Sequence, residues 1–174
     1  MNITVEKAKI TVKEMLRDRG YKKTVEDDYT IVADDSIIVY FSTDEKINKD
    51  NIQNFTSKYL QANKIKHGIF VYPNTITSTA KNLILNRMID GIYIELFHLT
   101  VLQYNITRHR LVPKHLKLEG EELQEIKSKY AKNLPKLSIM DPVSRYYDFS
   151  RGDIIKIYRN TGSSTDLISY RVVV

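Results

Sequence analysis

Apolar and polar residues alternate with helical periodicity at the start of the chain. One face of the predicted helix carries the apolar side chains of Val5, Ala8, Val12 and Leu16. Thr4 is suited to cap the first turn, and Gly20 is suited to the left-handed position that ends a helix. The pattern therefore predicts an amphipathic helix that begins after Thr4 and ends near Gly20.

Strands and helices then follow one another up to about residue 100. Residues 29–32 and 36–41 are β-branched and aromatic runs separated by three residues, which predicts an antiparallel hairpin. Residues 67–72 form a buried strand that Pro73 stops, and a further strand covers residues 92–97. Two helical faces lie between the strands, one made of Ile52, Phe55, Tyr59 and Ala62, the other of Ala80, Leu83, Ile84 and Met88. The first hundred residues thus predict an α/β layer structure with helices on a mixed sheet.

The pattern changes after residue 100. A helix is predicted from Glu119 to about Tyr130, because its acidic residues lead and its lysines trail, in accord with the helix dipole. Those residues are Glu119, Glu121, Glu122, Lys127, Lys129 and Lys132. Residues 154–159 and 167–174 predict a terminal hairpin across residues 161–164. We expect a mixed α+β and α/β fold with two domains, 1–100 and 101–174, and a boundary near residues 98–104.

Composition narrows the classes of function. Hydrophobic residues make up 42% of the chain and charged residues 28%, as in folded proteins. The absence of cysteine excludes a disulfide framework, a thiolate zinc site and a cysteine nucleophile. No apolar run approaches the roughly 18 residues of a membrane span, and nothing indicates a secretory signal. The net charge is +6, and its excess lies in residues 101–174, which favours contact with nucleic acid or an acidic partner.

Catalytic motifs are absent from the sequence. It has no Gly-x-Ser-x-Gly elbow and no phosphate-binding Gly-x-x-x-x-Gly-Lys loop. Of the four histidines only His109 and His115 are close, with no carboxylate at ligand spacing, so we expect them to form hydrogen bonds within a turn or at an interface. We predict no catalytic residue, no metal and no cofactor.

A nuclease is the enzyme alternative that the order of elements allows. Asp34 and Asp35 could be the first metal ligands, but the strand 37–41 offers neither a carboxylate nor a lysine to complete the site. We therefore expect the two aspartates to solvate a hairpin turn. A stand-alone basic module that binds nucleic acid is the other alternative.

Four segments in the second half of the chain occur in a characteristic order. They are NITRHRLVPKH at 105–115, DPVSRY at 141–146, RGDIIKI at 151–157 and YRVV at 170–173. In this order they resemble the fifth subunit shared by the nuclear RNA polymerases and the archaeal counterpart of that subunit. The resemblance is close over residues 105–174 and looser over residues 36–97.

The resemblance implies an accessory subunit without catalysis of its own. It implies a C-terminal assembly domain that docks on the largest polymerase subunit, next to smaller subunits, and an N-terminal jaw with a nuclease-like fold beside downstream double-stranded DNA. No cofactor, membrane or homo-oligomer is implied. The chain is short for a eukaryotic member, and Ile, Lys, Asn and Tyr supply 62 of its 174 residues, as AT-rich codons would produce. A large DNA virus or an AT-rich protist fits both features, with the nucleus as location if cellular and the virion or the host cytoplasm or nucleus if viral.

The family's Thr-Pro-Ser-Ala-Lys helix start is similar to residues 77–81, where Ser78 replaces the proline. Hydroxyls, a lysine and free N–H groups at a helix start suit a phosphate. The predicted DNA contacts are Thr77, Ser78, Thr79 and Lys81. Such contacts position DNA without reading bases, so the interaction should be weak and sensitive to salt. A helix cap is the alternative, and the two roles are compatible.

A second set of residues is predicted to contact other subunits. Asp141 should cap a short helix with Pro142 at its first position, from which Arg145 and Tyr146 project. These two side chains could bind a partner or close the core of their own domain, and both alternatives stay open. Gly152 should supply a turn that side chains disfavour. The predicted interface consists of Arg108, His109, Pro113, His115, Asp141, Pro142, Arg145, Tyr146, Arg151, Gly152, Lys156, Tyr170 and Arg171.

The interface set begins in a basic segment around Leu111–Pro113. Arg108, His109, Arg110 and Lys114 flank this apolar stretch. A solvated face would also explain these charges. We favour subunit docking over DNA for them, because the resemblance places the segment in the assembly domain.

Overall fold

The computed structural model describes residues 4–89, 91–130, 133–159 and 167–174. The chain forms two compact units, Met1–Tyr104 and Asn105–Val174, which we call the N-terminal and C-terminal units. Both combine helices with sheets, so the predicted mixed α/β character is confirmed. No helix among the described residues is both long and apolar enough to cross a membrane.

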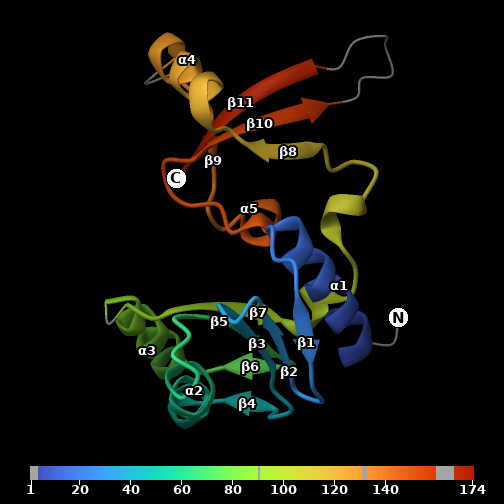
Figure 1. Ribbon diagram of the computed structural model, residues 1–174, viewed down its shortest axis with the longest axis vertical. Coiled ribbons are helices and arrows are strands. Elements are labelled where there is room, and N and C mark those ends of the chain that lie inside the picture. Colours follow the sequence, from blue (N-terminus) through green and yellow to red (C-terminus); the bar gives the residue numbers. More distant parts are fainter. Residues whose placement is uncertain (1–3, 90, 131–132, 160–166) are drawn as a thin grey trace. The chain divides into compact units, whose positions relative to one another are not determined.

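A five-stranded mixed sheet forms the centre of the N-terminal unit (Figure 1). Its strands, in spatial order, are β1 (Thr24–Glu26), β2 (Thr30–Ala33), β3 (Ile37–Phe41), β5 (His67–Tyr72) and β7 (Tyr93–His98). The pairs β1–β2 and β2–β3 are antiparallel, whereas β3–β5 and β5–β7 are parallel. Two short strands, β4 (Lys46–Ile47) and β6 (Thr75–Ile76), form a separate parallel pair. Three predictions are confirmed: the hairpin, the strand at residues 67–72 and the mixed sheet.

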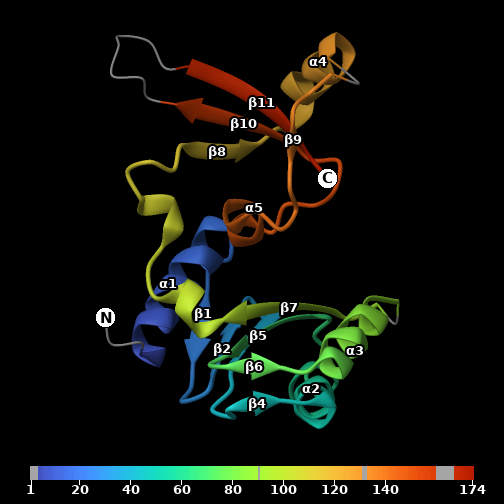
Figure 2. The ribbon, with the colours of Figure 1, turned by 180° about the vertical axis from the view of Figure 1, so that it is seen from behind.

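Helices cover both faces of this sheet (Figures 1 and 2). Helix α1 (Val5–Asp18) packs through Ala8, Val12, Met15 and Leu16, all fully buried. The predicted cap is confirmed, because Thr4 Oγ1 accepts the N–H of Lys7 at 3.3 Å and Gly20 has a φ of +98°. On the other face lie α2 (Lys49–Phe55), the π-helix η1 (Thr56–Gln61) and α3 (Ser78–Ile89).

The second face carries an aromatic and aliphatic core. It includes Ile38, Ile47, Ile52, Phe55, Leu60, Ile65, Phe70, Ala80, Ile84, Ile92 and Ile94. The intervening residues of β3 are buried as well, since Ile37 and Val39 are fully covered. A central strand that is apolar on both faces is expected where helices cover both sides of a sheet.

Three details of the N-terminal unit differ from the sequence predictions. Strand β1 has only exposed residues, so no alternation of polar and apolar positions marked it. The π-helix shifts the helical register, which leaves Ala62 exposed although its spacing placed it on the buried face. The last strand is Tyr93–His98, one residue later than predicted. The side chain of Met88 lies outside those that the structure describes.

The C-terminal unit has a four-stranded sheet of its own. Its order is β8 (Lys114–Lys117), β10 (Ile154–Arg159), β11 (Leu167–Val173) and β9 (Lys136–Leu137). The antiparallel pairing of β10 with β11 confirms the predicted terminal strands. The proposed turn at 161–164 and Lys132 lie outside the described residues.

Two helices pack on opposite faces of the C-terminal sheet. Helix α4 (Gly120–Tyr130) places Ile126 against Leu118 and Ile154. The other face holds Leu137, Phe149, Ile155, Ile157 and Val173, next to α5 (Pro142–Tyr147). Because successive residues of a strand point to opposite faces, Ile154 and Ile155 belong to different clusters.

Candidate interaction surfaces

The four predicted DNA contacts share the first turn of α3. Thr77 Oγ1 accepts the N–H of Ala80 at 3.3 Å, so the helix-cap alternative is confirmed for this residue. The same hydroxyl lies 3.0 Å from Thr79 Oγ1. Ser78, Thr79 and Lys81 are all exposed to solvent, whereas Thr77 is half-buried. The turn therefore presents two hydroxyls and one ammonium group to solvent beside the first amides of a helix.

Asp34 has a structural role in the hairpin between β2 and β3. Both aspartates of this turn adopt positive φ, 47° for Asp34 and 51° for Asp35. The carboxylate of Asp34 accepts the amide N–H groups of Lys22 and Lys23 at 2.9 and 2.7 Å. These hydrogen bonds lower the pKa of Asp34. The predicted turn role is confirmed, and it ties this turn to the chain segment that follows α1.

The N-terminal unit contains a buried ion pair between Arg19 and Glu95 that was not predicted from the sequence. Glu95 on β7 accepts two bonds from the guanidinium of Arg19, at 2.7 and 2.8 Å, and one from His67 Nε2 at 2.9 Å. Burial raises the pKa of Glu95, but the bonds from Arg19 and His67 outweigh it and hold the pKa below its usual value. The signal in the sequence was a single carboxylate inside an otherwise apolar strand. The pair joins the end of α1 to the neighbouring strands β5 and β7, which is a role in the fold.

Helix α5 begins as predicted. Asp141 Oδ1 accepts the N–H of Val143 at 2.8 Å, and Pro142 occupies the first turn. Tyr146 is only 3% exposed, and its hydroxyl accepts a bond from Asn105 Nδ2 at 2.8 Å. Burial and the bond to Asn105 give Tyr146 a contact inside its own unit. Arg145 is half-buried in the same turn.

The basic segment after Asn105 is held by short-range hydrogen bonds. Asn105 Oδ1 accepts the N–H of Thr107 at 2.9 Å and so starts the 3-10 helix η3 (Ile106–Arg108). His109 Nδ1 accepts the N–H of Leu111 at 3.2 Å, as the turn hypothesis predicted. His115 is 8% exposed and its Nδ1–H donates to the carbonyl of Pro113 at 2.7 Å. Burial lowers the pKa of His115 despite this bond. His115 therefore shapes the segment from inside the unit, whereas Arg108 and His109 are exposed.

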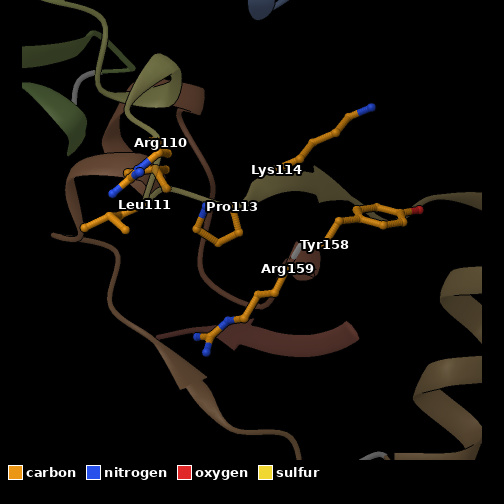
Figure 3. Close-up of a pocket in the computed structure, with 7 residues that line it drawn as sticks. Arg110, Leu111, Pro113, Lys114, Tyr158 and Arg159 are labelled. Carbon is orange, nitrogen blue, oxygen red and sulfur yellow. The ribbon is translucent and has the colours of Figure 1, made fainter. Parts of the chain in front are cut away.

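A pocket of about 740 Å³ opens beside this segment (Figure 3). Its wall is formed by residues 110–114 of the basic segment and by the last two residues of β10. The lining residues among those that the structure describes are Arg110, Leu111, Val112, Pro113, Lys114, Tyr158 and Arg159. The sequence marked the first group as basic groups around an apolar stretch. It did not indicate that Tyr158 and Arg159 complete the wall.

The remaining predicted interface residues make contacts inside their own unit. Lys156 Nζ donates to Glu122 Oε1 at 2.7 Å, and this bond raises the pKa of Lys156. Tyr170 also donates to Glu122, at 3.4 Å, and Arg171 Nη1 donates to the carbonyl of Lys136 at 3.1 Å. The turn role of Gly152 is confirmed by its φ of +90°. Arg151 beside it is exposed.

Comparison with known proteins gives a consistent result. Residues 104–173 match the family described as RNA polymerase Rpb5, C-terminal domain. Subunit RPABC1 of the DNA-directed RNA polymerases I, II and III from Dictyostelium discoideum is 34% identical over 188 residues, covering 94% of each chain. The chain belongs to the family of polymerase fifth subunits. It is an accessory subunit of a DNA-directed RNA polymerase without an active site of its own.

Further relatives of this fifth subunit extend over both units. The Caenorhabditis briggsae RPABC1 is 33% identical and covers 94% of this chain and 82% of its own length. A subunit 5-like protein of Arabidopsis thaliana is 29% identical over 203 residues, 97% of this chain and 94% of its own. Among solved structures, a DNA-bound Type ISP restriction-modification enzyme, LlaBIII, gives a TM-score of 0.40 at 19% identity over 78% of this chain and 11% of that chain. That similarity is too low to carry an argument.

The segment of this fifth subunit that matches the family is nearly the same as the C-terminal unit of the structure. The family match spans 104–173 and the C-terminal unit spans Asn105–Val174. The exposed basic segment, the pocket and helix α5 all belong to this unit. The first turn of α3 belongs to the N-terminal unit, which the full-length relatives also cover.

Proposed function

We propose that the C-terminal unit docks this chain on the largest subunit of its polymerase, next to smaller subunits, while the N-terminal unit forms a jaw beside downstream DNA. The observation that carries the proposal is the relationship to a polymerase subunit over 94% of both chains, which includes both units. In a cellular organism such a subunit works in the nucleus. A viral source would place it in the virion or in the host cytoplasm or nucleus.

The geometry of the C-terminal unit supports a docking role. Arg108 and His109 are exposed on a segment that hydrogen bonds of Asn105 and His109 already hold in place. A contact surface that is ordered before binding loses less conformational entropy on association. In this proposal Tyr146 does not contact the partner itself. Its hydroxyl accepts a hydrogen bond from Asn105 and so helps to hold the start of the segment in place.

The start of α3 supports the jaw role. Ser78, Thr79 and Lys81 are accessible to solvent beside the amides of the first helical turn, an arrangement suited to a phosphate oxygen. Contacts of this kind do not read bases. The proposed interaction with DNA is therefore independent of sequence and weakens with salt.

Docking is tested by purifying the tagged full-length chain with its largest polymerase subunit after co-expression. We expect Arg145→Ala, and the pair Arg108→Ala with His109→Ala, to lower recovery of the large subunit while the circular dichroism spectrum stays that of the parent. Lys127→Ala on the exposed face of α4 is the matched control. Normal recovery with both sets of variants would show that the docking surface lies elsewhere. Recovery of the chain without any polymerase subunit would support the stand-alone nucleic-acid module.

The jaw contact is tested in the assembled polymerase. We expect Lys81→Ala to lower retention of downstream duplex DNA and to reduce the slope of log affinity against log salt by about one, the effect of a single lost phosphate contact. Lys66→Ala, another exposed lysine of the N-terminal unit, should leave both quantities unchanged. Unchanged retention with Lys81→Ala would refute the assignment of this turn to DNA.

A further inference from the structure

The pocket of the C-terminal unit has a one-sided charge. Among the described residues that line it, Arg110, Lys114 and Arg159 are cations, and none of these residues is acidic. Among the described residues of this unit, ion pairs join Lys117 to Asp153 and Lys156 to Glu122, and none is found at the three pocket cations. A concentration of like charge in a concave surface favours an anionic ligand.

Apolar walls accompany these charges. Leu111 is 75% exposed although it is a large aliphatic side chain, and Pro113 lies beside it in the pocket (Figure 3). A proline-containing segment is conformationally restricted, so its shape is set before a ligand arrives. The pocket therefore offers an apolar contact in addition to charge.

Tyr158, another lining residue, is held in position by its neighbours in the sheet. Tyr158 pairs with Lys114 on the neighbouring strand β8, so the two side chains lie on the same face of the sheet. Lys156 Nζ lies 5.2 Å from the centroid of the Tyr158 ring and is itself bound to Glu122 at 2.7 Å. One face of the ring is thus already occupied by a cation. The ring lies on the side of Lys114 and points away from Arg159 (Figure 3).

We propose that this pocket binds an acidic, extended peptide segment of a partner subunit, with carboxylates on Arg110 and Arg159 and one apolar side chain against Leu111 and Pro113. The inference rests on the proposed function in that the partner is taken to be a polymerase subunit. A volume of about 740 Å³ holds a few side chains, within the usual range of ligand pockets.

The observations favour a peptide over nucleic acid. Single-stranded binding needs successive stacking platforms, whereas this pocket has one aromatic ring with one face already covered by Lys156. A phosphate backbone would engage the cations but leave Leu111 exposed to water. An acidic segment that includes an apolar residue satisfies both features.

The test measures binding of two labelled peptides to the full-length chain by fluorescence anisotropy. Both have about twelve residues rich in Asp and Glu; one has a central Leu and the other a Ser in its place. We expect the Leu peptide to bind more tightly, and the double variant Arg110→Glu with Arg159→Glu to weaken its binding about tenfold or more. Leu111→Ser should remove the preference for Leu over Ser. The double variant Lys127→Glu with Lys129→Glu on α4 changes the net charge by the same amount and is the matched control; it should change Kd by less than about twofold.

Three results would overturn the inference. One is a loss with Lys127→Glu plus Lys129→Glu equal to that of Arg110→Glu plus Arg159→Glu, which would mean attraction to net charge alone. Another is absence of peptide binding by the parent chain. The third is displacement of the peptide by a short duplex or single strand with no effect of Leu111→Ser, which would make the pocket a nucleic-acid site. Co-purification with the largest subunit is scored separately: a chain that assembles but binds no peptide refutes only this inference, whereas a chain that binds peptide but never assembles refutes the proposed function.

Discussion

Substituting alanine for Gly68 should destabilise the N-terminal unit, although glycine is a poor residue for the middle of a strand. Gly68 lies on β5, paired with Ile38 on one side and Ile94 on the other. A Cβ at this position would stand 2.8 and 2.9 Å from two ring atoms of Phe55 and 3.0 Å from Leu60 Cδ2, where ordinary contacts are 3.4–4 Å. The helical segment formed by α2 and η1 approaches the sheet so closely that it excludes even a methyl group.

The ring of Phe55 has little room to move away. It is 1% exposed, and its centroid lies 5.4 Å from that of Phe70, 5.7 Å from Tyr40 and 6.1 Å from Tyr59. Overpacking of a core costs about 1–3 kcal/mol, and replacing glycine by alanine returns about 0.4–1 kcal/mol by restricting the unfolded chain. We expect a net loss of about 1–2 kcal/mol, which corresponds to a melting temperature roughly 2–8 °C lower for a chain of this length.

Urea unfolding of the parent, Gly68→Ala, Phe55→Leu and the double variant measures this effect as a thermodynamic cycle. Phe55→Leu alone should destabilise by creating a cavity. In that background the alanine methyl group gains space, so the added cost of Gly68→Ala should fall to near zero or reverse. A Gly68→Ala variant as stable as the parent would refute the steric argument. A cost that persists unchanged in the Phe55→Leu background would show that another contact is responsible.

Two further predictions concern the ion pair and the cap. Glu95→Gln should lower the free energy of unfolding at pH 7 by about 2 kcal/mol, because Gln cannot provide the charged acceptor for Arg19 and His67. The folded-state pKa of Glu95 lies below its usual value of 4.5, so this stabilisation is complete above about pH 4.5 and is lost as the pH falls through the folded pKa. In urea titrations the difference between parent and variant should therefore shrink below pH 4.5, and a constant or growing difference contradicts the assignment. Asp141→Ala should cost about 1 kcal/mol by thermal unfolding while Asp141→Asn stays near the parent, since asparagine also caps helices; equal losses in both variants would argue against the cap.

Local pattern was sufficient for much of the architecture. The first helix, the β2–β3 hairpin, β5 and β10 were predicted from periodicity, capping residues and β-branched runs, all of which act over a few residues. The same holds for the cap at Asp141 and the turn at Gly152. The order of four short motifs also indicated the family, because each motif depends on residue identity rather than on geometry.

The tertiary structure decided which side chains meet. Glu95 forms hydrogen bonds with Arg19 and His67, which are 76 and 28 residues away in the sequence. Tyr146 forms one with Asn105, which is 41 residues away. Helical and strand periods carry no information about such pairs, since they depend on the register of strands and the packing of helices onto them. For the same reason the sequence left open whether Tyr146 is a contact or part of the core.

The pocket shows this division most clearly. The sequence by itself determined that Arg110 and Lys114 flank a rigid apolar segment, and that residues 154–159 form a strand. Only the antiparallel register of β8 with β10 places Tyr158 opposite Lys114 on one face of the sheet and leaves Arg159 on the other face, in the same pocket as Arg110. A register shifted by one residue would turn these side chains to the other face of the sheet. The charges of the pocket are thus encoded locally, whereas the presence of Arg110 and Arg159 in one pocket is a consequence of strand pairing.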